Sequence, residues 1–545
     1  MTKTTSPQAL RHRWTNNLEV ALVDVREEGP YSIAHPLFAV TVPVTEIEDK
    51  LPALVPRLGV PVVVYDDGEG YAERAVPRIE SLGYTDVSIL EGGLAGYARV
   101  GEIYRDVNVP SKAFGELVEA IQGTPSRPPR EINQLLADEE SDIVVLDARR
   151  FEEYNTMSIP RGRSCPGGEL LYRVFDAAPS PDTTVIVHCA GRTRSLIGTQ
   201  SLLNAGIPNK VVALRDGTIG WTLEDLKGGG LPPLETGKTG RVPPPSEEAI
   251  RRARKHATSW AEHVGVPIIQ CLQLLEFLAV HAANERTLYL LDVRDPSEYA
   301  EGHPDRFQSA PGGQLVQATD EWIGVRGSRA VLYDTDGVRA RMTASWLLQL
   351  GWDVYVFDHE AALPKLPAST HMRPSYTSPP GESGIAVDEL KQLLDNKGVT
   401  VVDLARSPAY RKGRIPGAWH TSGPELARDL ASIEGDDLLV LTSPDGVIAQ
   451  ANVEDARKAG AHRTVQYLVG GTAAWTKASL PLESGADNAR WLSSPIDVYK
   501  RPYEGTGNDR EAMEGYIEWE HQLVAQLAND GVANFHVVRD TRTKA

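Results

Sequence analysis

Residues 185–195, Val-Ile-Val-His-Cys-Ala-Gly-Arg-Thr-Arg-Ser, combine groups that could do chemistry on an anion. An apolar run leads into Cys189, and Arg192 and Arg194 follow before a predicted helix. A thiolate at the start of such a loop faces backbone N–H groups and the partial positive charge of a helix N-terminus. Guanidinium groups bind anions through paired N–H donors. We therefore predict that Cys189 is a nucleophile and that the following residues bind its anionic substrate: Ala190, Gly191, Arg192, Thr193 and Arg194.

The surroundings of Cys189 recur along the chain without the cysteine. An Asp ends an apolar strand four times, and a Tyr follows each Asp seven residues later. A helix in each copy ends at a glycine, and 17 residues before that glycine lies the position that Cys189 occupies in the second copy. Regular spacing of this kind predicts four copies of one unit, only one of which has a thiol at this position. The Asp residues are Asp24, Asp147, Asp292 and Asp403, the Tyr residues are Tyr31, Tyr154, Tyr299 and Tyr410, and the positions that correspond to Cys189 are Asp66, Asp334 and Ser443.

Several motifs of these copies are similar to those of tandem rhodanese-homology proteins. They are the Asp-x-Arg strand end, the Gly-Arg-Ile-Pro-Gly-Ala turn at 413–418, the strand-Cys-loop-helix and the Gly-Gly-x-x-x-Trp close at 470–475. The resemblance covers nearly the whole chain. It implies an α/β fold of four rhodanese-like domains, each a central, mostly parallel sheet flanked by helices; the pattern of the tail adds a C-terminal helical extension. It also implies that Cys189 carries a sulfane sulfur as a persulfide.

Composition changes and the repeat spacing divide the chain into five segments. Turn-rich, polar stretches at 228–245 and 366–381 are predicted linkers. An aromatic-rich tail follows the last copy, with an amphipathic helix expected over 510–529. The predicted segments are an inactive domain at 1–106, the catalytic domain at 107–232, inactive domains at 246–368 and 382–485, and the extension at 486–545.

The length of the cysteine loop separates two kinds of chemistry. Cysteine phosphatases use Cys-x5-Arg to hold a phosphate, whereas Cys189 and Arg194 form Cys-x4-Arg. The shorter loop favours a sulfurtransferase over a phosphatase or an arsenate reductase. Attack of the Cys189 thiolate on thiosulfate would expel sulfite and leave a persulfide, and cyanide or a thiol would then remove the outer sulfur. The alternative is a scaffold or a redox or persulfide sensor without catalysis.

Other polar residues near the site receive supporting or structural interpretations. Asp147 and Arg149 either form an ion pair that supports the site or make a polar contact that holds the fold. The second interpretation is preferred, because the first and third copies keep both residues without a nucleophile. His188 precedes the cysteine, but adjacent strand residues point to opposite faces, so it is not proposed as the general base. Cys165 is a candidate for a sulfur relay, and its alternative role is to fill a turn. Ala405 replaces the expected Arg in the fourth copy.

The acidic loops of the first and third copies have two interpretations. Asp66-Asp67-Gly68-Glu69 and Asp334-Thr335-Asp336-Gly337 could attract a cation. The spacing of a twelve-residue calcium loop is absent, and Asp is a favoured helix cap. Helix capping is therefore the preferred interpretation, and no metal site is predicted.

Composition limits the partners. A net charge of −18 in 545 residues argues against nucleic acid and anionic membranes as partners. Three cysteines suit a reducing compartment, and no leader or membrane-spanning stretch is evident, so a cytoplasmic location is expected. The expected partners are a small anionic sulfur donor, a thiol or cyanide acceptor and, as an alternative, a persulfide-carrying protein. No cofactor is predicted, and the sequence is compatible with an oligomer.

Overall fold

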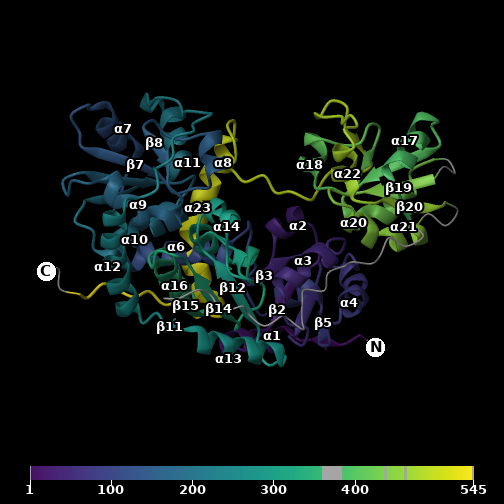
Figure 1. The fold of residues 1–545 in the computed structure, drawn as a ribbon, viewed down its shortest axis with the longest axis horizontal. Helices are drawn as coiled ribbons and strands as arrows, with labels where there is room; N and C mark the ends of the chain where they lie inside the picture. Colours follow the sequence, from purple (N-terminus) through teal and green to yellow (C-terminus); the bar gives the residue numbers. More distant parts are fainter. Residues whose placement is uncertain (1, 359–382, 435–437, 460–462, 543–545) are drawn as a thin grey trace. The chain divides into compact units, whose positions relative to one another are not determined.

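The chain folds around four parallel β-sheets, shown in Figure 1 in colours that follow the sequence. The computed structural model describes residues 2–358, 383–434, 438–459 and 463–542. The linker expected at 366–381 lies outside these residues. The first sheet contains β1 (Thr4–Thr5), β5 (Val87–Leu90), β4 (Val62–Tyr65), β2 (Ala21–Asp24) and β3 (Ala39–Thr41), in that spatial order.

The other three sheets repeat this order of strands. The second is β6 (Ser126–Arg127), β10 (Val211–Leu214), β9 (Thr184–His188), β7 (Ile143–Asp147) and β8 (Gly162–Ser164). The third is β11 (Ile268–Ile269), β15 (Asp353–Phe357), β14 (Arg329–Tyr333), β12 (Leu288–Asp292) and β13 (Gln308–Ser309). The fourth is β16 (Gly384–Ile385), β20 (Val465–Leu468), β19 (Leu438–Thr442), β17 (Val399–Asp403), β18 (Trp419–His420) and β21 (Arg490–Trp491).

Helices connect successive strands of each sheet, as parallel pairing requires. The short helices after the Asp-ended strands are α2 (Glu28–Ile33), α8 (Phe151–Thr156), α14 (Pro296–Glu301) and α18 (Ser407–Lys412). Next come α3 (Ile47–Leu54), α9 (Leu170–Ala177), α15 (Gly312–Gln317) and α19 (Leu426–Leu430). The helices after the position of Cys189 are α4 (Tyr71–Ser81), α10 (Thr193–Ala205), α16 (Arg339–Gln349) and the pair α20 (Val447–Ala451) and α21 (Val453–Ala459).

The remaining helices close or join the repeats. The closing helices are α5 (Gly93–Tyr97), α11 (Gly217–Glu224) and α22 (Gly471–Lys477). The others are α1 (Pro7–Thr15), α6 (Val109–Gln122), α7 (Pro129–Ala137), α12 (Glu247–Val264), α13 (Cys271–Ala282), α17 (Val387–Asp395) and α23 (Arg510–Asp530). None of the helices within the described residues is both long and apolar enough to cross a membrane.

The predicted repeat is confirmed at the level of single hydrogen bonds. The four Asp residues of the pattern end β2, β7, β12 and β17. The hydroxyl of each Tyr donates to the carbonyl oxygen eight residues further on, for example Tyr154 to Gly162 at 3.1 Å and Tyr410 to Ala418 at 2.7 Å. The Tyr therefore closes the turn between an Asp-ended strand and the next strand in every copy.

The Asp-x-Arg pair is structural in three copies and incomplete in the fourth. Asp147 lies against Arg149 at 2.7 Å, and the same pairs form between Asp24 and Arg26 and between Asp292 and Arg294. Arg149 lowers the pKa of the buried Asp147 carboxyl. Where Ala405 replaces the Arg, burial raises the pKa of Asp403 to about 7.

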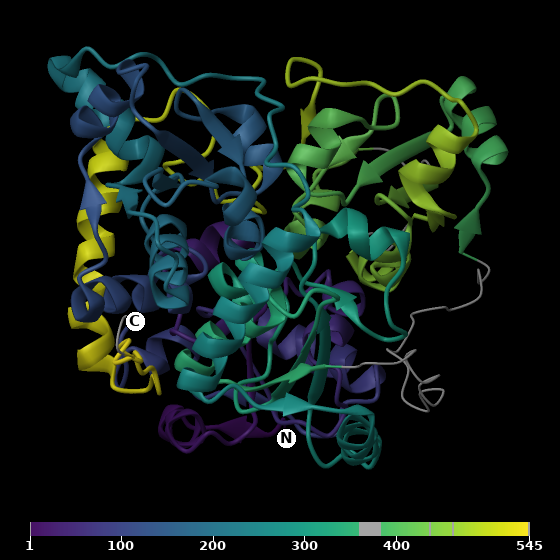
Figure 2. The ribbon, with the colours of Figure 1, turned by 60° about the vertical axis from the view of Figure 1, so that its left-hand side comes forward.

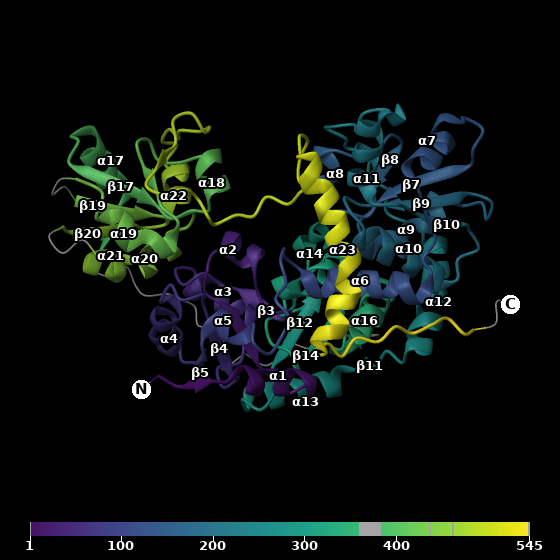
Figure 3. The same ribbon diagram turned by 180° about the vertical axis from the view of Figure 1, so that it is seen from behind.

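The four sheets are grouped into two compact units, and this grouping does not follow their order in the chain. The first and fourth belong to one compact unit, and the second and third belong to the other together with residues 500–545. The tail expected to form one extension from residue 486 is divided, because β21 pairs with β18 and widens the fourth sheet. The helix expected over 510–529 is present as α23, which packs on α6 and α11 beside the second sheet; Figures 2 and 3 show it in yellow.

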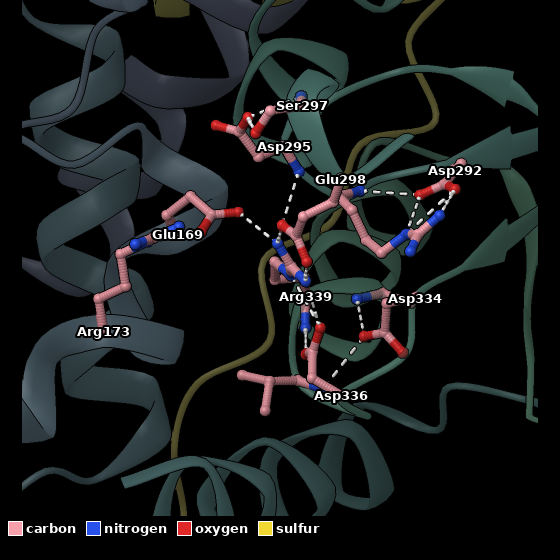
Figure 4. A network of polar contacts seen from close by, with 12 residues as sticks. Glu169, Arg173, Asp292, Asp295, Ser297, Glu298, Asp334, Asp336 and Arg339 are labelled. Carbon is pink, nitrogen blue, oxygen red and sulfur yellow. Dashed lines mark hydrogen bonds and ion pairs between the residues drawn. The ribbon is translucent and has the colours of Figure 1, made fainter. Parts of the chain in front are cut away.

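A buried arginine joins the second and third repeats (Figure 4). Arg339, at the start of α16, has a fully buried side chain. Its Nη1 donates to Glu169 of the second repeat at 2.9 Å, its Nη2 donates to Glu298 at 2.8 Å and its Nε donates to Asp336 at 2.8 Å. The backbones also meet closely, since a Cβ on Gly168 would lie 2.7 Å from the amide nitrogen of Gly313.

We expect Arg339→Met to destabilise this unit by about 3 to 5 kcal/mol, because it leaves buried carboxylates without their cation. Hydrogen exchange of the α16 amides measures the loss. Arg341→Met is the matched control, since Arg341 pairs at 2.6 Å with the more exposed Asp358 and its removal should cost within about 1 kcal/mol. Equal effects of the two substitutions would contradict the structural role given to Arg339.

Candidate active site

Cys189 lies directly after β9 and at the start of the loop that enters α10. Its side chain is buried, with 2% of the residue exposed. The start of α11 supports the loop from below: Thr218 donates its backbone N–H to the carbonyl of Cys189 at 3.0 Å, and Ile219 donates to that of Ala190 at 2.9 Å. Gly217 is required here, since a Cβ on it would lie 2.4 Å from the Cys189 carbonyl oxygen.

The sulfur of Cys189 faces the first turn of α10. Sγ lies 3.5 Å from Oγ of Ser195, six residues further along the chain. In the other repeats the residue six positions later donates its backbone N–H to the side chain in the place of the cysteine: Ala72 to Asp66 at 3.0 Å, Ala340 to Asp334 at 2.8 Å and Ala449 to Ser443 at 3.2 Å. The Asp side chains of the two acidic loops therefore cap the helices that follow, as expected. The second repeat has a sulfur atom at the same position.

The ionisation of Cys189 reflects two opposing effects. Burial raises the pKa of the thiol above its ordinary value. The positive charge of Arg194 and the hydrogen bonds from Ser195 act in the opposite direction and favour the thiolate. These groups of the loop and the following helix partly offset the burial, but the pKa of the thiol stays above its ordinary value.

Arg192 holds the loop in place. Its Nε donates to Glu116 and its Nη1 donates to Asp216, both at 2.8 Å, and Nη2 also contacts Glu119. Two of these carboxylates lie on α6 and one lies before α11. The sequence predicted Arg192 as an anion ligand, and this stays a prediction; the contacts observed are with carboxylates of the protein itself.

Arg194 has fewer carboxylate partners than Arg192. Its Nη1 and Nη2 donate to the two carboxylate oxygens of Glu153 at 2.6 and 2.7 Å. Arg194 lies five residues after Cys189, as Arg339 lies five residues after Asp334 in the third repeat. Glu153 and Glu298 likewise correspond, since each lies six residues after the Asp that ends its strand.

Arg339 has two further carboxylate partners, Asp336 of its own repeat and Glu169 of the second repeat, and Arg194 has no counterpart of either. Gly191 stands where the third repeat has Asp336, and Gln314 stands where the second repeat has Glu169. Among the described residues, Glu153 is the carboxylate that pairs with Arg194. Arg194 is therefore held by one carboxylate, whereas Arg339 is held by three.

Arg194 lines a cavity of about 430 Å³. The other charged residues of its lining are Arg150 and Arg501 and the four glutamates Glu152, Glu153, Glu321 and Glu504. The wall combines residues of the second repeat, the third repeat and the segment before α23. A small anion in this cavity would meet Arg194 beside the loop that holds Cys189.

Asp147, Arg149 and His188 form a buried group behind the loop. Ser158 donates to Asp147 at 2.8 Å, and His188 Nε2 lies 3.4 Å from the same carboxylate. Burial lowers the pKa of His188 to about 4, so the ring is neutral near pH 7. Because the first and third repeats keep the same Asp–Arg pair, we interpret this group as support for the sheet.

Cys165 follows β8 and lies in the apolar core of the second repeat. It packs in a buried cluster that includes Leu146 and Val187. Burial raises the pKa of its thiol to about 12, so it is protonated near neutral pH. Its predicted relay role is left as a prediction.

Two elements outside the predicted site contribute to its walls. Glu116 and Lys112 lie on α6, and Tyr516 and Glu520 lie on α23. A Cβ on Gly191 would lie 3.2 Å from Cε1 of Tyr516 and 3.4 Å from Oε2 of Glu520. Sequence reasoning found the aromatic concentration of the tail but not its contact, because no local pattern shows where a terminal helix packs.

Known proteins share this architecture and its repeats. A crystal structure of a thiosulfate sulfurtransferase from Pseudomonas aeruginosa matches 98% of this chain and all of that chain, at 46% identity with a TM-score of 0.91. The thiosulfate sulfurtransferase GlpE of Shewanella oneidensis is 27% identical over 95 residues, 17% of this chain and 93% of that protein. The HTH-type transcriptional regulator Rv0324 of Mycobacterium tuberculosis is 29% identical over 216 residues, 37% of this chain and 88% of that protein. The model of the rhodanese-like domain matches residues 6–99, 128–224, 276–359 and 386–478, so the chain belongs to the rhodanese-like family and contains four such domains.

Proposed function

We propose that the protein is a sulfurtransferase in which Cys189 carries the transferred sulfur. The observation that supports this most directly is the loop comparison. Three repeats place an oxygen of Asp or Ser against the amide six residues later, and the second repeat places the Cys189 sulfur at the corresponding position. A loop that stabilises a carboxylate in two of its copies suits a thiolate and a persulfide anion in another.

Thiosulfate is the donor that we propose. The Cys189 thiolate attacks the outer sulfur, the S–S bond of thiosulfate breaks, and sulfite leaves with the bonding electron pair. The persulfide anion stays on Cys189 until cyanide or a thiolate takes its outer sulfur and regenerates the cysteine thiolate. The full-length relative from Pseudomonas aeruginosa is named a thiosulfate sulfurtransferase, which supports the same donor here.

Arg194 is the residue that we propose for binding the sulfonate end of the donor. It has one carboxylate partner, against three for its counterpart in the third repeat, and it faces the cavity beside the loop. The first, third and fourth repeats serve as scaffold, with the third contributing to the wall of the cavity.

Incubation with thiosulfate should add the mass of one sulfur atom to the intact protein, and cyanide should remove it. Mass spectrometry reads this directly. We expect no addition in Cys189→Ser and full addition in Cys165→Ser, because Cys165 is protonated and lies in the core. Loss of loading in Cys165→Ser would support the relay instead, and a wild-type protein that takes no sulfur from thiosulfate would falsify the proposed donor.

Arg194→Gln should lower kcat/KM for thiosulfate about 10- to 100-fold, because a hydrogen bond to a charged group contributes about 1.5 to 3 kcal/mol. Steady-state release of sulfite measures the change. Arg251→Gln, on the exposed part of α12, is the control and should behave as wild type. If Arg194→Gln kept the wild-type kcat/KM, the assignment of the sulfonate site would be wrong.

The rate at which neutral iodoacetamide alkylates Cys189 should keep rising at pH values where the alkylation rate of a free cysteine has already reached its plateau. Only the thiolate reacts, and burial raises the pKa of this thiol, so its thiolate fraction keeps growing at higher pH. Arg194→Gln should move the profile to still higher pH because it removes a charge that favours the thiolate. Peptide mass spectrometry measures the modified fraction, and a profile that levels off below that of a free cysteine would contradict this description.

A further inference from the structure

The C-terminal segment places a carboxyl group against the cysteine loop. On α23, drawn in yellow beside α6 in Figure 3, Tyr516 and Glu520 are the groups nearest to Gly191. Because Gly191 has no side chain, nothing from that residue stands between the loop and Oε2 of Glu520. The third repeat has Asp336 at the corresponding position. The second repeat thus leaves room at a point where its structural counterpart has a carboxylate.

An aromatic cage fixes the position of this segment. The ammonium group of Lys112, on α6, lies 5.6 Å from the ring centre of Tyr503, 5.2 Å from that of Tyr516 and 5.5 Å from that of Trp519. Lys112 is 2% exposed, and cation–π contacts strengthen when they are desolvated. Since Glu520 lies one turn after Tyr516, the cage also determines where Glu520 meets the loop.

Glu520 is fully buried, and its two oxygens have different surroundings. Tyr516 donates its hydroxyl to Oε1 at 2.8 Å. Oε2, the oxygen that faces Gly191, has no hydrogen-bond partner within the described part of the chain. A buried carboxyl oxygen without a partner is costly, and the cost is greatest when the group is charged. The arrangement fits a neutral acid whose proton is on Oε2.

The charges around Glu520 agree with this state. On α6, the carboxylate of Glu116 disfavours ionisation and the ammonium of Lys112 favours it. Arg192, on the loop, also favours ionisation, but its own donors are engaged by Glu116, Glu119 and Asp216. Burial is the largest effect and raises the pKa of Glu520 to about 8, and a charged Glu520 would in turn disfavour the Cys189 thiolate.

We propose that Glu520, as its carboxylic acid, is a further catalytic residue: its Oε2–H donates a hydrogen bond to the anionic sulfur species held at Cys189. This inference rests on the proposed sulfurtransferase function and deepens it. No proton is transferred, so the balance of the reaction is unchanged. In the free enzyme the donor has no partner, and it gains one only when an anion is present, which favours the loaded state over the empty one.

The test compares Glu520→Gln with Glu520→Ala. Sulfur loading from thiosulfate is followed between about pH 6 and about pH 10, the range that spans thiol and raised carboxyl ionisation. The Gln amide keeps a donor toward the loop and an acceptor for Tyr516, so loading near neutral pH should stay within about threefold of wild type, and Ala should lose about tenfold. Glu518→Ala, an exposed position on the same helix, is the control and should match wild type.

The pH profile separates a hydrogen-bond donor from a merely structural residue. Since the pKa of Glu520 is raised to about 8, the Glu520 carboxyl group of the wild-type protein is protonated below that pH and ionised above it. The ratio of the Glu520→Gln rate to the wild-type rate should therefore rise as the pH passes about 8. Tyr516→Phe should move this rise to higher pH, because the Tyr516 hydroxyl helps to lower the pKa of Glu520.

Each other outcome overturns the inference. A Gln-to-wild-type ratio that is flat with pH excludes the donor role, as does a folded Glu520→Gln protein without activity, which would require the carboxylate itself. If Glu520→Ala loads sulfur like wild type, the inference fails while Cys189-dependent loading leaves the proposed function standing. A wild-type protein that does not load sulfur at all overturns both.

Discussion

The backbone N–H groups at the start of the helices that follow β4, β9, β14 and β19 need an acceptor, and the candidate site is built around that need. These donors have no partner within their own helix. In the first and third repeats a carboxylate supplies the acceptor, and in the fourth repeat a hydroxyl does. The second repeat puts Cys189 there, so a position that caps a helix elsewhere in the chain holds a sulfur atom. One residue type distinguishes the capping loops from the loop that we propose to be reactive.

The distribution of carboxylates around two corresponding arginines gives the repeats different properties. Arg339 is neutralised by Glu169, Glu298 and Asp336 and joins two domains. Arg194 keeps the Glu153 that corresponds to Glu298 and has no counterpart of the other two carboxylates. The same arginine position thus joins two domains in the third repeat and lines a cavity beside the Cys189 loop in the second.

Burial determines the charge of groups that the sequence would assign to their ordinary states. Asp147, beside Arg149, keeps its charge within the core, whereas Asp403, without an arginine, has its pKa raised to about 7. Glu520 follows the same rule at the loop of Cys189, where several acidic and basic groups are packed by three elements distant in the chain. Protonation here is a property of packing and not of residue type.

The repeat, the position of Cys189 and the Asp–Tyr turn could be read from the sequence because each depends on contacts between residues close together in the chain. The resemblance to rhodanese-homology proteins implied the parallel sheets, and the amphipathic pattern predicted a helix over 510–529. The partners of Arg192 and Arg194, the pairing of the second repeat with the third, and the contact of Tyr516 and Glu520 with Gly191 could not be predicted. These depend on surfaces brought together from up to hundreds of residues apart, whose docking leaves no periodic signal in the chain. The sequence alone therefore determined which residue we propose as the nucleophile, because that rests on local spacing, and the tertiary structure decided which charges surround it.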